Sequence, residues 1–221
     1  MTDKIKSTLN KILAAIFPER CVCCGASGGK AICQSCENAF VGTHIVRPSA
    51  SQQNGMKAKT GADSVFFAYK YGNKTLTKAI FALKERNNAA LADYFADKIY
   101  ASVKQIKVDI ITNAPRSGEN KNRHGYDHAA LLAKRLAPLM GVKYENLLAE
   151  KTSRAEQKTL NLEERRINTE GGYKVTAKYI PKAVLIVDDV CTSGETLKEC
   201  IAMLRGAGAE TLFAAVIANR M

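Results

Sequence analysis

Residues 183–197 (AVLIVDDVCTSGETL) constrain the fold of this chain more than any other stretch. The first five form a continuous apolar run, which is typical of a central parallel strand that is buried on both faces. Two acids and a short run of small and hydroxylic residues follow, and we expect a helix to begin at Glu195. This order predicts an α/β unit whose turn lies at the carboxyl edge of a parallel sheet, where ligands bind in open α/β folds.

Short apolar stretches alternate with amphipathic ones from residue 65 onward. We expect strands at residues 65–71, 108–112, 147–149, 183–187 and 211–217, and helices at 74–85, 89–103, 127–139 and 195–205. The repeated order of strand, helix and strand implies right-handed crossovers between parallel strands. The predicted fold class is α/β, a parallel sheet flanked by helices.

The composition is that of a soluble protein with one main domain. The chain has 221 residues, enough for one sizeable α/β domain and a small module, and no apolar run reaches the roughly 18 residues of a membrane span. Residues 1–17 have apolar positions at helical spacing between lysines and lack a signal-peptide cleavage site. We expect an amphipathic helix there, which packs on the protein or lies on a membrane or partner surface as a peripheral contact.

The net charge of +12 favours polyanionic partners, although lysine-rich solvated surfaces give the same excess. The basic residues form no dense run of the kind that marks a nucleic-acid tail. Charge alone therefore leaves nucleic-acid binding open.

Five of the seven cysteines lie within residues 21–36. An odd count without a signal peptide argues against a secreted disulfide scaffold, and we expect a reducing, cytoplasmic location. Two CxxC pairs can supply the four thiolates of a closed structural zinc site, and Cys23 is left over. The predicted metal ligands are Cys21, Cys24, Cys33 and Cys36.

Three other interpretations of this cysteine module stay open. The cysteines fit a redox dithiol or a module without metal, and a zinc-bound module fits a docking surface as well as a purely structural unit. We divide the chain into residues 1–41, which hold the first helix and the cysteine module, a linker at 42–62 and the main domain at 63–221. The linker assignment rests on residues 48–60, which are polar and small and show no apolar periodicity.

The turn after the 183–187 strand has the residue types of a phosphate site. Its backbone N–H groups and hydroxyls can surround a phosphate at a helix N-terminus. Asp188 and Asp189 would repel a bare phosphate, but they suit ribose hydroxyls beside it, with Mg²⁺ nearby. The alternatives fit less well, because a P-loop needs a lysine at the position of Glu195 and mere helix capping does not explain two acids. The predicted phosphate-binding residues are Thr192, Ser193, Gly194, Glu195 and Thr196.

Residues 184–197 resemble the signature of type I phosphoribosyltransferases, which bind phosphoribosyl pyrophosphate (PRPP). The resemblance implies a phosphoribosyltransferase-like parallel sheet and Mg²⁺ bound with PRPP. It also implies that Asp188 and Asp189 hold the ribose hydroxyls at the catalytic centre, while the Thr192–Thr196 loop holds the 5-phosphate.

Together with the cysteine module, this loop resembles the ComF family of bacterial competence proteins. Agreement extends to Phe67–Tyr69, Leu83-Lys84, Ala114–Arg116, residues 123–128, Gln157 and residues 164–168. The segment Gly125-Tyr126-Asp127-His128 departs from the common Gly-Phe-Asn-Gln. The resemblance implies a small N-terminal zinc-ribbon module and a role with single-stranded DNA and DNA-uptake proteins. The alternative function is an active phosphoribosyltransferase that transfers ribose 5-phosphate to an acceptor.

Several polar residues have two interpretations each. Arg116, Arg165 and Arg166 suit a pyrophosphate contact or a flap over the ligand, or else exposed ion pairs. His124 and His128 lie four residues apart, which fits a metal pair, but surface or capping histidines are the commoner case. Cys191 and Cys200 are expected to be packing residues, with Cys191 the more reactive thiol if it is exposed.

Overall fold

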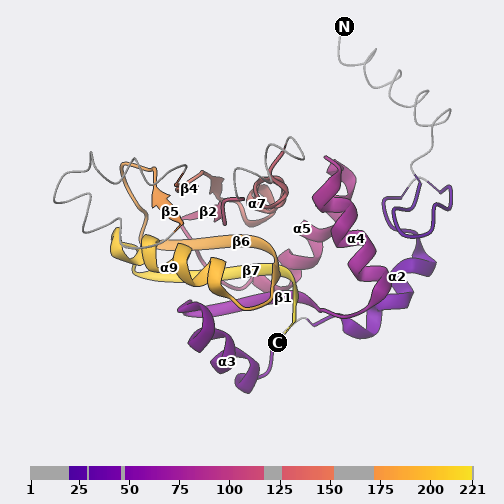
Figure 1. Ribbon diagram of the computed structural model, residues 1–221, viewed down its shortest axis with the longest axis horizontal. Coiled ribbons are helices and arrows are strands. Elements are labelled where there is room, and N and C mark those ends of the chain that lie inside the picture. The colour runs from indigo at the N-terminus through magenta and orange to yellow at the C-terminus, as the bar shows by residue number, and fades with distance from the viewer. Residues whose placement is uncertain (1–19, 29, 46–47, 117–125, 152–171, 221) are drawn as a thin grey trace, which may run out of the picture.

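The computed structural model describes residues 20–28, 30–45, 48–116, 126–151 and 172–220, and Figure 1 shows a central sheet with helices on both faces. The sheet has five parallel strands in the order β1-β7-β6-β2-β3, and a separate antiparallel pair is formed by β4 and β5. This confirms the predicted fold class. The strands are β1 (Ser64–Lys70), β2 (Ile110–Asn113), β3 (Lys143–Tyr144), β4 (Leu148–Glu150), β5 (Tyr173–Val175), β6 (Ala183–Cys191) and β7 (Thr211–Asn219), and the helices are α2 (Gln34–Phe40), α3 (Ala50–Thr60), α4 (Lys74–Glu85), α5 (Ala89–Val103), α7 (His128–Met140) and α9 (Glu195–Gly206), with a 3-10 turn at Val41–Thr43.

The two faces of the sheet bury two separate hydrophobic clusters. In β6, Leu185 and Val187 face the cluster built with α4, α5 and α7, whereas Val184 and Ile186 face the cluster built with α3 and α9. Side chains of a strand alternate between faces, so the continuous apolar run of β6 is what a strand covered on both sides requires. The core therefore holds β6 rigidly at the centre of the molecule.

Strand β6 runs four residues beyond its predicted end. It stays paired with β7 through Cys191, which pairs with Asn219, so Asp188 and Asp189 lie inside the strand and not in the turn after it. The other predicted strands and helices that have a counterpart agree within two residues, and α4 and α5 have the predicted bounds. The short β3 and β5 were missed because two- and three-residue strands carry no measurable periodicity.

The expectation that residues 48–60 lack regular structure was wrong, because Ala50–Thr60 forms helix α3. Ser49 and Gln52 make a reciprocal capping box, and Gly61 ends the helix in the left-handed region with φ 72°. Met56 and Thr60 are its buried residues, so the apolar stripe is too narrow to give a periodic signal. The helix packs against α9 and β1.

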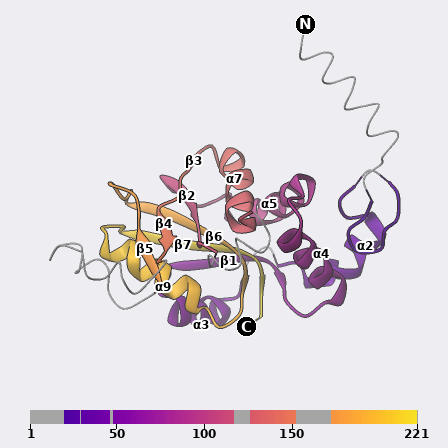
Figure 2. The ribbon, with the colours of Figure 1, turned by 45° about the horizontal axis from the view of Figure 1, so that its top comes forward.

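The cysteine module lies at the start of α4, as Figure 2 shows for its helix α2. The Asn73 side-chain amide donates to the carbonyl of Ala39 at 2.9 Å, and the Cys23 thiol donates to the carbonyl of Thr75 at 3.5 Å. The rings of Phe40 and Tyr69 also meet edge to face at 5.4 Å. The module is thus attached to the main domain through the first turn of α4 and through β1. In the part of the chain that the structure describes, no helix is long and apolar enough to span a membrane.

Candidate functional site

The turn between β6 and α9 has a backbone that only glycine adopts easily. Gly194 has φ 85°, and a Cβ added there would lie 3.2 Å from Thr60 Cγ2 and 3.7 Å from Cys191 Sγ. Any side chain would therefore be both strained and crowded. Gly194 is the N-cap of α9 and has no side chain to cap it, so the first turn of the helix faces a small hollow lined by residues 190–197 and Asp188. Thr192, Ser193 and Thr196 are exposed beside it, so their hydroxyls are accessible.

A larger cavity of about 330 Å³ continues from this hollow. The two share Asp188, Val190 and Thr196 as lining residues. The rest of the cavity wall comes from four other parts of the chain, because α4, the segment after β2, the start of α7 and strand β5 all reach it. Its polar lining residues are Lys84, Arg116, His128, Tyr173, Asp188, Asp189 and Thr196.

The two acids of β6 have different surroundings. Asp189 is buried, and its Oδ2 forms an ion pair with Lys84 Nζ at 2.9 Å and lies within hydrogen-bond reach of His128 Nε2. Burial opposes its ionisation, but His128 and Lys84 outweigh that effect and hold the pKa of Asp189 below its usual range. Asp188 is half-buried and accepts from the backbone N–H of Asp189 at 2.8 Å, and no described cation forms an ion pair with it. Burial together with the charge of Asp189 raises its pKa. The pair therefore carries less than two negative charges at neutral pH.

His128 links Arg116 to Asp189. The Arg116 guanidinium lies 3.2 Å from His128 Nδ1. A guanidinium can only donate hydrogen bonds, so Nδ1 accepts and the ring proton sits on Nε2, which faces Asp189. The expectation of a surface or capping histidine is thus wrong for His128, which is buried in the site. His128, Asp188 and Asp189 could together approach a metal ion, but this tautomer directs His128 toward Asp189 instead.

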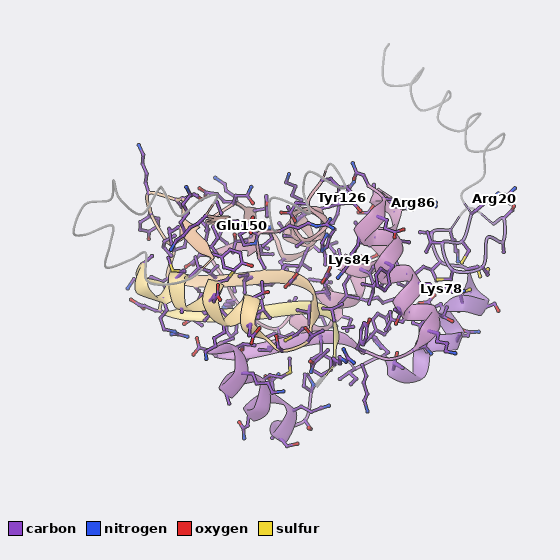
Figure 3. All side chains as sticks on the ribbon, in the orientation of Figure 1. Arg20, Lys78, Lys84, Arg86, Tyr126 and Glu150 are labelled. Atoms are coloured by element: carbon purple, nitrogen blue, oxygen red, sulfur yellow. The ribbon has the colours of Figure 1, made fainter. Side chains whose placement is uncertain are left out.

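Tyr126 and Asp127, which precede His128 in the segment that differs from the common Gly-Phe-Asn-Gln, also have definite contacts. The Tyr126 hydroxyl lies between the carbonyl oxygens of Leu83 and Arg86, the latter at 2.6 Å. Asp127 caps α7 by accepting from the backbone N–H of Ala130 at 3.0 Å. Figure 3 shows Tyr126 beside Arg86 at the end of α4, with Lys84 nearer the sheet. The segment therefore fastens α4 and α7 around the cavity.

The four predicted metal ligands lie together. The sulfurs of Cys21, Cys24, Cys33 and Cys36 are all within 4.8 Å of one another, and those of Cys24 and Cys33 are 3.6 Å apart. A tetrahedral zinc with Zn–S bonds of about 2.3 Å has edges of about 3.8 Å, so the arrangement fits that ion. Cys23 lies outside the cluster, and burial raises the pKa of its thiol to about 11.

The structure brings some predicted site residues together and leaves others out. The loop, both acids and Arg116 line the hollow or the cavity. Arg165, Arg166, His124 and Gln157 lie outside the described residues, so their roles stay predictions. Cys191 and Cys200 are buried, and burial raises the pKa of Cys191 to about 11, which keeps that thiol protonated and unreactive.

Sequence reasoning did not find Tyr173 as a lining residue and identified Lys84 only through a family resemblance. Lys84 lies 105 residues before Asp189, and no local pattern links the two. Tyr173 comes from the three-residue strand β5, and burial raises the pKa of its hydroxyl to about 12. The apolar pattern of α4 was the one available signal, since it predicts Leu83 in the core and Lys84 beside it.

Comparison with known proteins gives one family match and several similar solved structures. Residues 123–221 match the family described as phosphoribosyl transferase domain. Among solved structures, the chain is similar to UMP synthase from Leishmania donovani, with 20% identity, 59% of this chain and 22% of that chain covered and a TM-score of 0.37. It is also similar to the glutamine PRPP amidotransferase of B. subtilis, with 16% identity, 62% of this chain and 30% of that chain covered and a TM-score of 0.42. A purine phosphoribosyltransferase from Pyrococcus horikoshii is similar too, with 20% identity, 58% of this chain and 72% of that chain covered and a TM-score of 0.36. The chain thus spans less than a third of the length of the first two. No curated protein sequence matches the chain.

Proposed function

We propose that the protein binds PRPP with Mg²⁺ in the cavity at the carboxyl edge of its sheet. The observation that carries the proposal is the placement of three kinds of group along one continuous space. A glycine turn at a helix start suits a phosphate, the acids of β6 suit ribose hydroxyls, and the cations beyond them suit a second anionic group. The match of residues 123–221 to the phosphoribosyl transferase domain family supports the same ligand.

In this proposal each part of the ligand has its own contacts. The 5-phosphate lies in the Thr192–Thr196 loop, and the ribose hydroxyls face Asp188 and Asp189. Arg116 contacts the diphosphate, and Arg165 and Arg166 close over it as a flap. The oxygen-rich acid pair is also the donor type that Mg²⁺ prefers, with Asp188 the accessible member. When bound, Mg²⁺ would neutralise charge on the diphosphate.

The cysteine module would hold one structural Zn²⁺ through Cys21, Cys24, Cys33 and Cys36. The cluster of four sulfurs supports this, because four thiolates complete a tetrahedron and leave no position open for catalysis. The ion would fold a segment with few core residues of its own.

We further propose a ComF-like role in DNA uptake, with single-stranded DNA and uptake proteins as partners in the cytoplasm. Two features support this role. The chain has both a four-cysteine cluster and a segment that resembles a PRPP-binding loop, and its net charge is +12. Binding to single-stranded DNA would be electrostatic and would weaken steeply as salt increases.

Tyr173 favours a second candidate function, an active phosphoribosyltransferase. Its half-buried ring lines the cavity and could stack against an acceptor base, which would displace the diphosphate from C1 of the ribose. The transition state would resemble an oxocarbenium ion, and positioning and charge neutralisation would supply most of the rate.

The test of PRPP binding is a thermal shift with PRPP and Mg²⁺. A ligand that binds only the folded state raises the melting temperature, by an amount that grows with concentration. We expect a shift for wild type and a much smaller one for the Asp188→Ala/Asp189→Ala variant, with circular dichroism confirming that the variant is folded. An equal shift for both proteins, or none for wild type at about millimolar PRPP, would reject the proposal.

Two further measurements separate the candidate roles. Fluorescence polarisation with a labelled single strand at low and high salt tests DNA binding, which we expect at low salt only. A screen of nucleobases for diphosphate release tests the transferase. Release with one base and no DNA binding at either salt would favour the enzyme over the DNA-uptake role.

A further inference from the structure

We infer that Lys84 is the residue by which the cavity recognises the diphosphate arm of its ligand, and so distinguishes PRPP from ribose 5-phosphate. The inference rests on the proposed function of the same cavity and assigns it a specificity residue.

The position of Lys84 along the cavity supports this assignment. The hollow at the phosphate loop and the larger cavity meet at Asp188, Val190 and Thr196, whereas Lys84 and Arg116 line the larger cavity alone. A ligand whose 5-phosphate fills the hollow has its ribose at the shared residues. Its C1 substituent then points into the part of the cavity that Lys84 and Arg116 line.

The ammonium group of Lys84 has donors to spare. Its Nζ is 2.9 Å from Asp189 Oδ2, but the Lys84 side chain is 33% exposed while that of Asp189 is 7% exposed. An ammonium group has three N–H donors, and the ion pair with Asp189 uses one side of it. The other donors are therefore available to an anionic oxygen in the cavity.

The backbone beneath Lys84 is held in place before any ligand arrives. Arg116 donates to the carbonyl of Lys84 at 3.4 Å, and the Tyr126 hydroxyl lies within hydrogen-bond reach of the carbonyls of Leu83 and Arg86. The Leu83 side chain is fully buried. These contacts fix the last turn of α4, which lowers the entropy cost of using its lysine for binding.

The charges of the site favour a second cation there. Among the described lining residues, a diphosphate without Lys84 would face Asp188 and Asp189 with Arg116 as the one cation beside them. Lys84 neutralises Asp189 and leaves the cavity end positive, which suits a group with several negative charges. Ribose 5-phosphate has a hydroxyl at C1, so it gains little from the same cation.

The test compares affinities of PRPP and ribose 5-phosphate by calorimetry at one fixed Mg²⁺ concentration. For Lys84→Met we expect PRPP binding to weaken about 10- to 100-fold, the range of a lost charge-assisted hydrogen bond. Binding of ribose 5-phosphate should change less than about threefold. Lys78→Met is the matched control, because Lys78 is exposed on the same helix and lines neither space, and it should leave both affinities unchanged.

Lys84→Met leaves the buried Asp189 without its lysine partner, and this could prevent folding. A second pair of variants tests the inference in that event. Asp189→Asn removes that charge and should weaken both ligands alike, because both have the ribose hydroxyls. Adding Lys84→Met to it should then weaken PRPP alone. Equal losses for the two ligands, or no loss for either, would overturn the role of Lys84 while wild type still binds PRPP. If wild type binds neither ligand, the proposed function and this inference fall together.

Discussion

Asp188 has a carboxyl whose charge the folded protein disfavours. Burial and the neighbouring charge of Asp189 raise its pKa from an ordinary 3.8 to about 8. A raised pKa means that the unfolded chain releases this proton at a lower pH than the native protein does. The stability that depends on the neutral form is therefore complete below pH 3.8 and is lost progressively as the pH rises toward about 8. Ionisation of Asp188 thus lowers the stability of the folded protein at neutral pH, as expected of a residue whose role is in ligand binding.

We predict that Asp188→Asn raises the melting temperature in the absence of ligand. The gain should be about 2–4 °C for each kcal/mol recovered, and larger near pH 8 than near pH 5. Thermal melts at the two pH values measure it.

Asp63→Asn is the control with the opposite sign. Burial opposes ionisation of Asp63, but the backbone N–H of Leu212 and the Arg205 side chain lower its pKa, so its charged form stabilises the protein. This variant should lower the melting temperature at both pH values. A gain for Asp188→Asn that shrinks as the pH rises would contradict the assignment.

Gly194 is the residue on which the shape of the turn between β6 and α9 depends. We predict that Gly194→Ala destabilises the protein by about 1–2 kcal/mol and weakens PRPP binding, because alanine disfavours a positive φ and its Cβ would meet Thr60. Urea unfolding and calorimetry measure the two effects. Gly206→Ala, at the far end of α9 with open space around it, should neither destabilise the protein nor weaken PRPP binding, because alanine is accommodated in a helix.

At the residue scale, the grouping of nearby residues was predictable and their distant partners were not. The four cysteines and the turn between β6 and α9 can be identified because each is a compact sequence pattern. The environment of Asp189 could not be predicted, since Lys84 and His128 approach it from distant helices. His128 was interpreted as a surface or capping residue for the same reason.

Elements with a wide apolar face were predictable, and elements held by a few specific contacts were not. Helix α4 buries Leu76, Ala79, Ile80 and Leu83 at helical spacing, and its bounds agree with the prediction. Helix α3 is held instead by its capping box and by Gln53, whose side chain bonds both backbone groups of Val65 at 2.8 and 3.1 Å. Such contacts leave no periodic trace in the sequence.

The cysteine module gives an element-scale prediction with an internal control. Cys24→Ser should reduce bound zinc from about one ion per chain to near zero, because a hydroxyl is a poor zinc ligand. Cys23→Ser should keep the ion, since Cys23 lies outside the cluster and contacts Thr75 instead. Elemental analysis of protein purified without chelator measures both. Equal zinc loss in the two variants would mean that the ligand set is wrong.

At the scale of the whole molecule, α4 spans the distance between the two candidate binding sites. Its first turn contacts the cysteine module through Asn73 and Thr75, and its last turn carries Lys84 to Asp189. A change in the module can therefore alter the position of a cation in the cavity.

We predict that removing zinc weakens PRPP binding about 5-fold or more, the low end of ordinary coupling between sites. Linkage requires the reverse effect of equal size, so PRPP should strengthen zinc binding by the same factor. Calorimetry before and after treatment with a chelator measures the first effect, and restoring zinc should restore the affinity. Unchanged PRPP affinity in folded, metal-free protein would show that the sites are independent.

The strand order has a consequence for how the chain is made. Among the described strands the neighbour of β1 is β7, with Ser64 paired to Phe213, so β1 lacks this partner until the ribosome has released the chain past β7. Pairing across so many residues is slow, because the entropy of closing the loop is lost before any contact forms. The cysteine cluster is complete much earlier, at Cys36, and can capture an ion during synthesis. The nascent chain therefore carries a finished module beside an unfinished sheet, and its exposed apolar strands are what a chaperone would meet first.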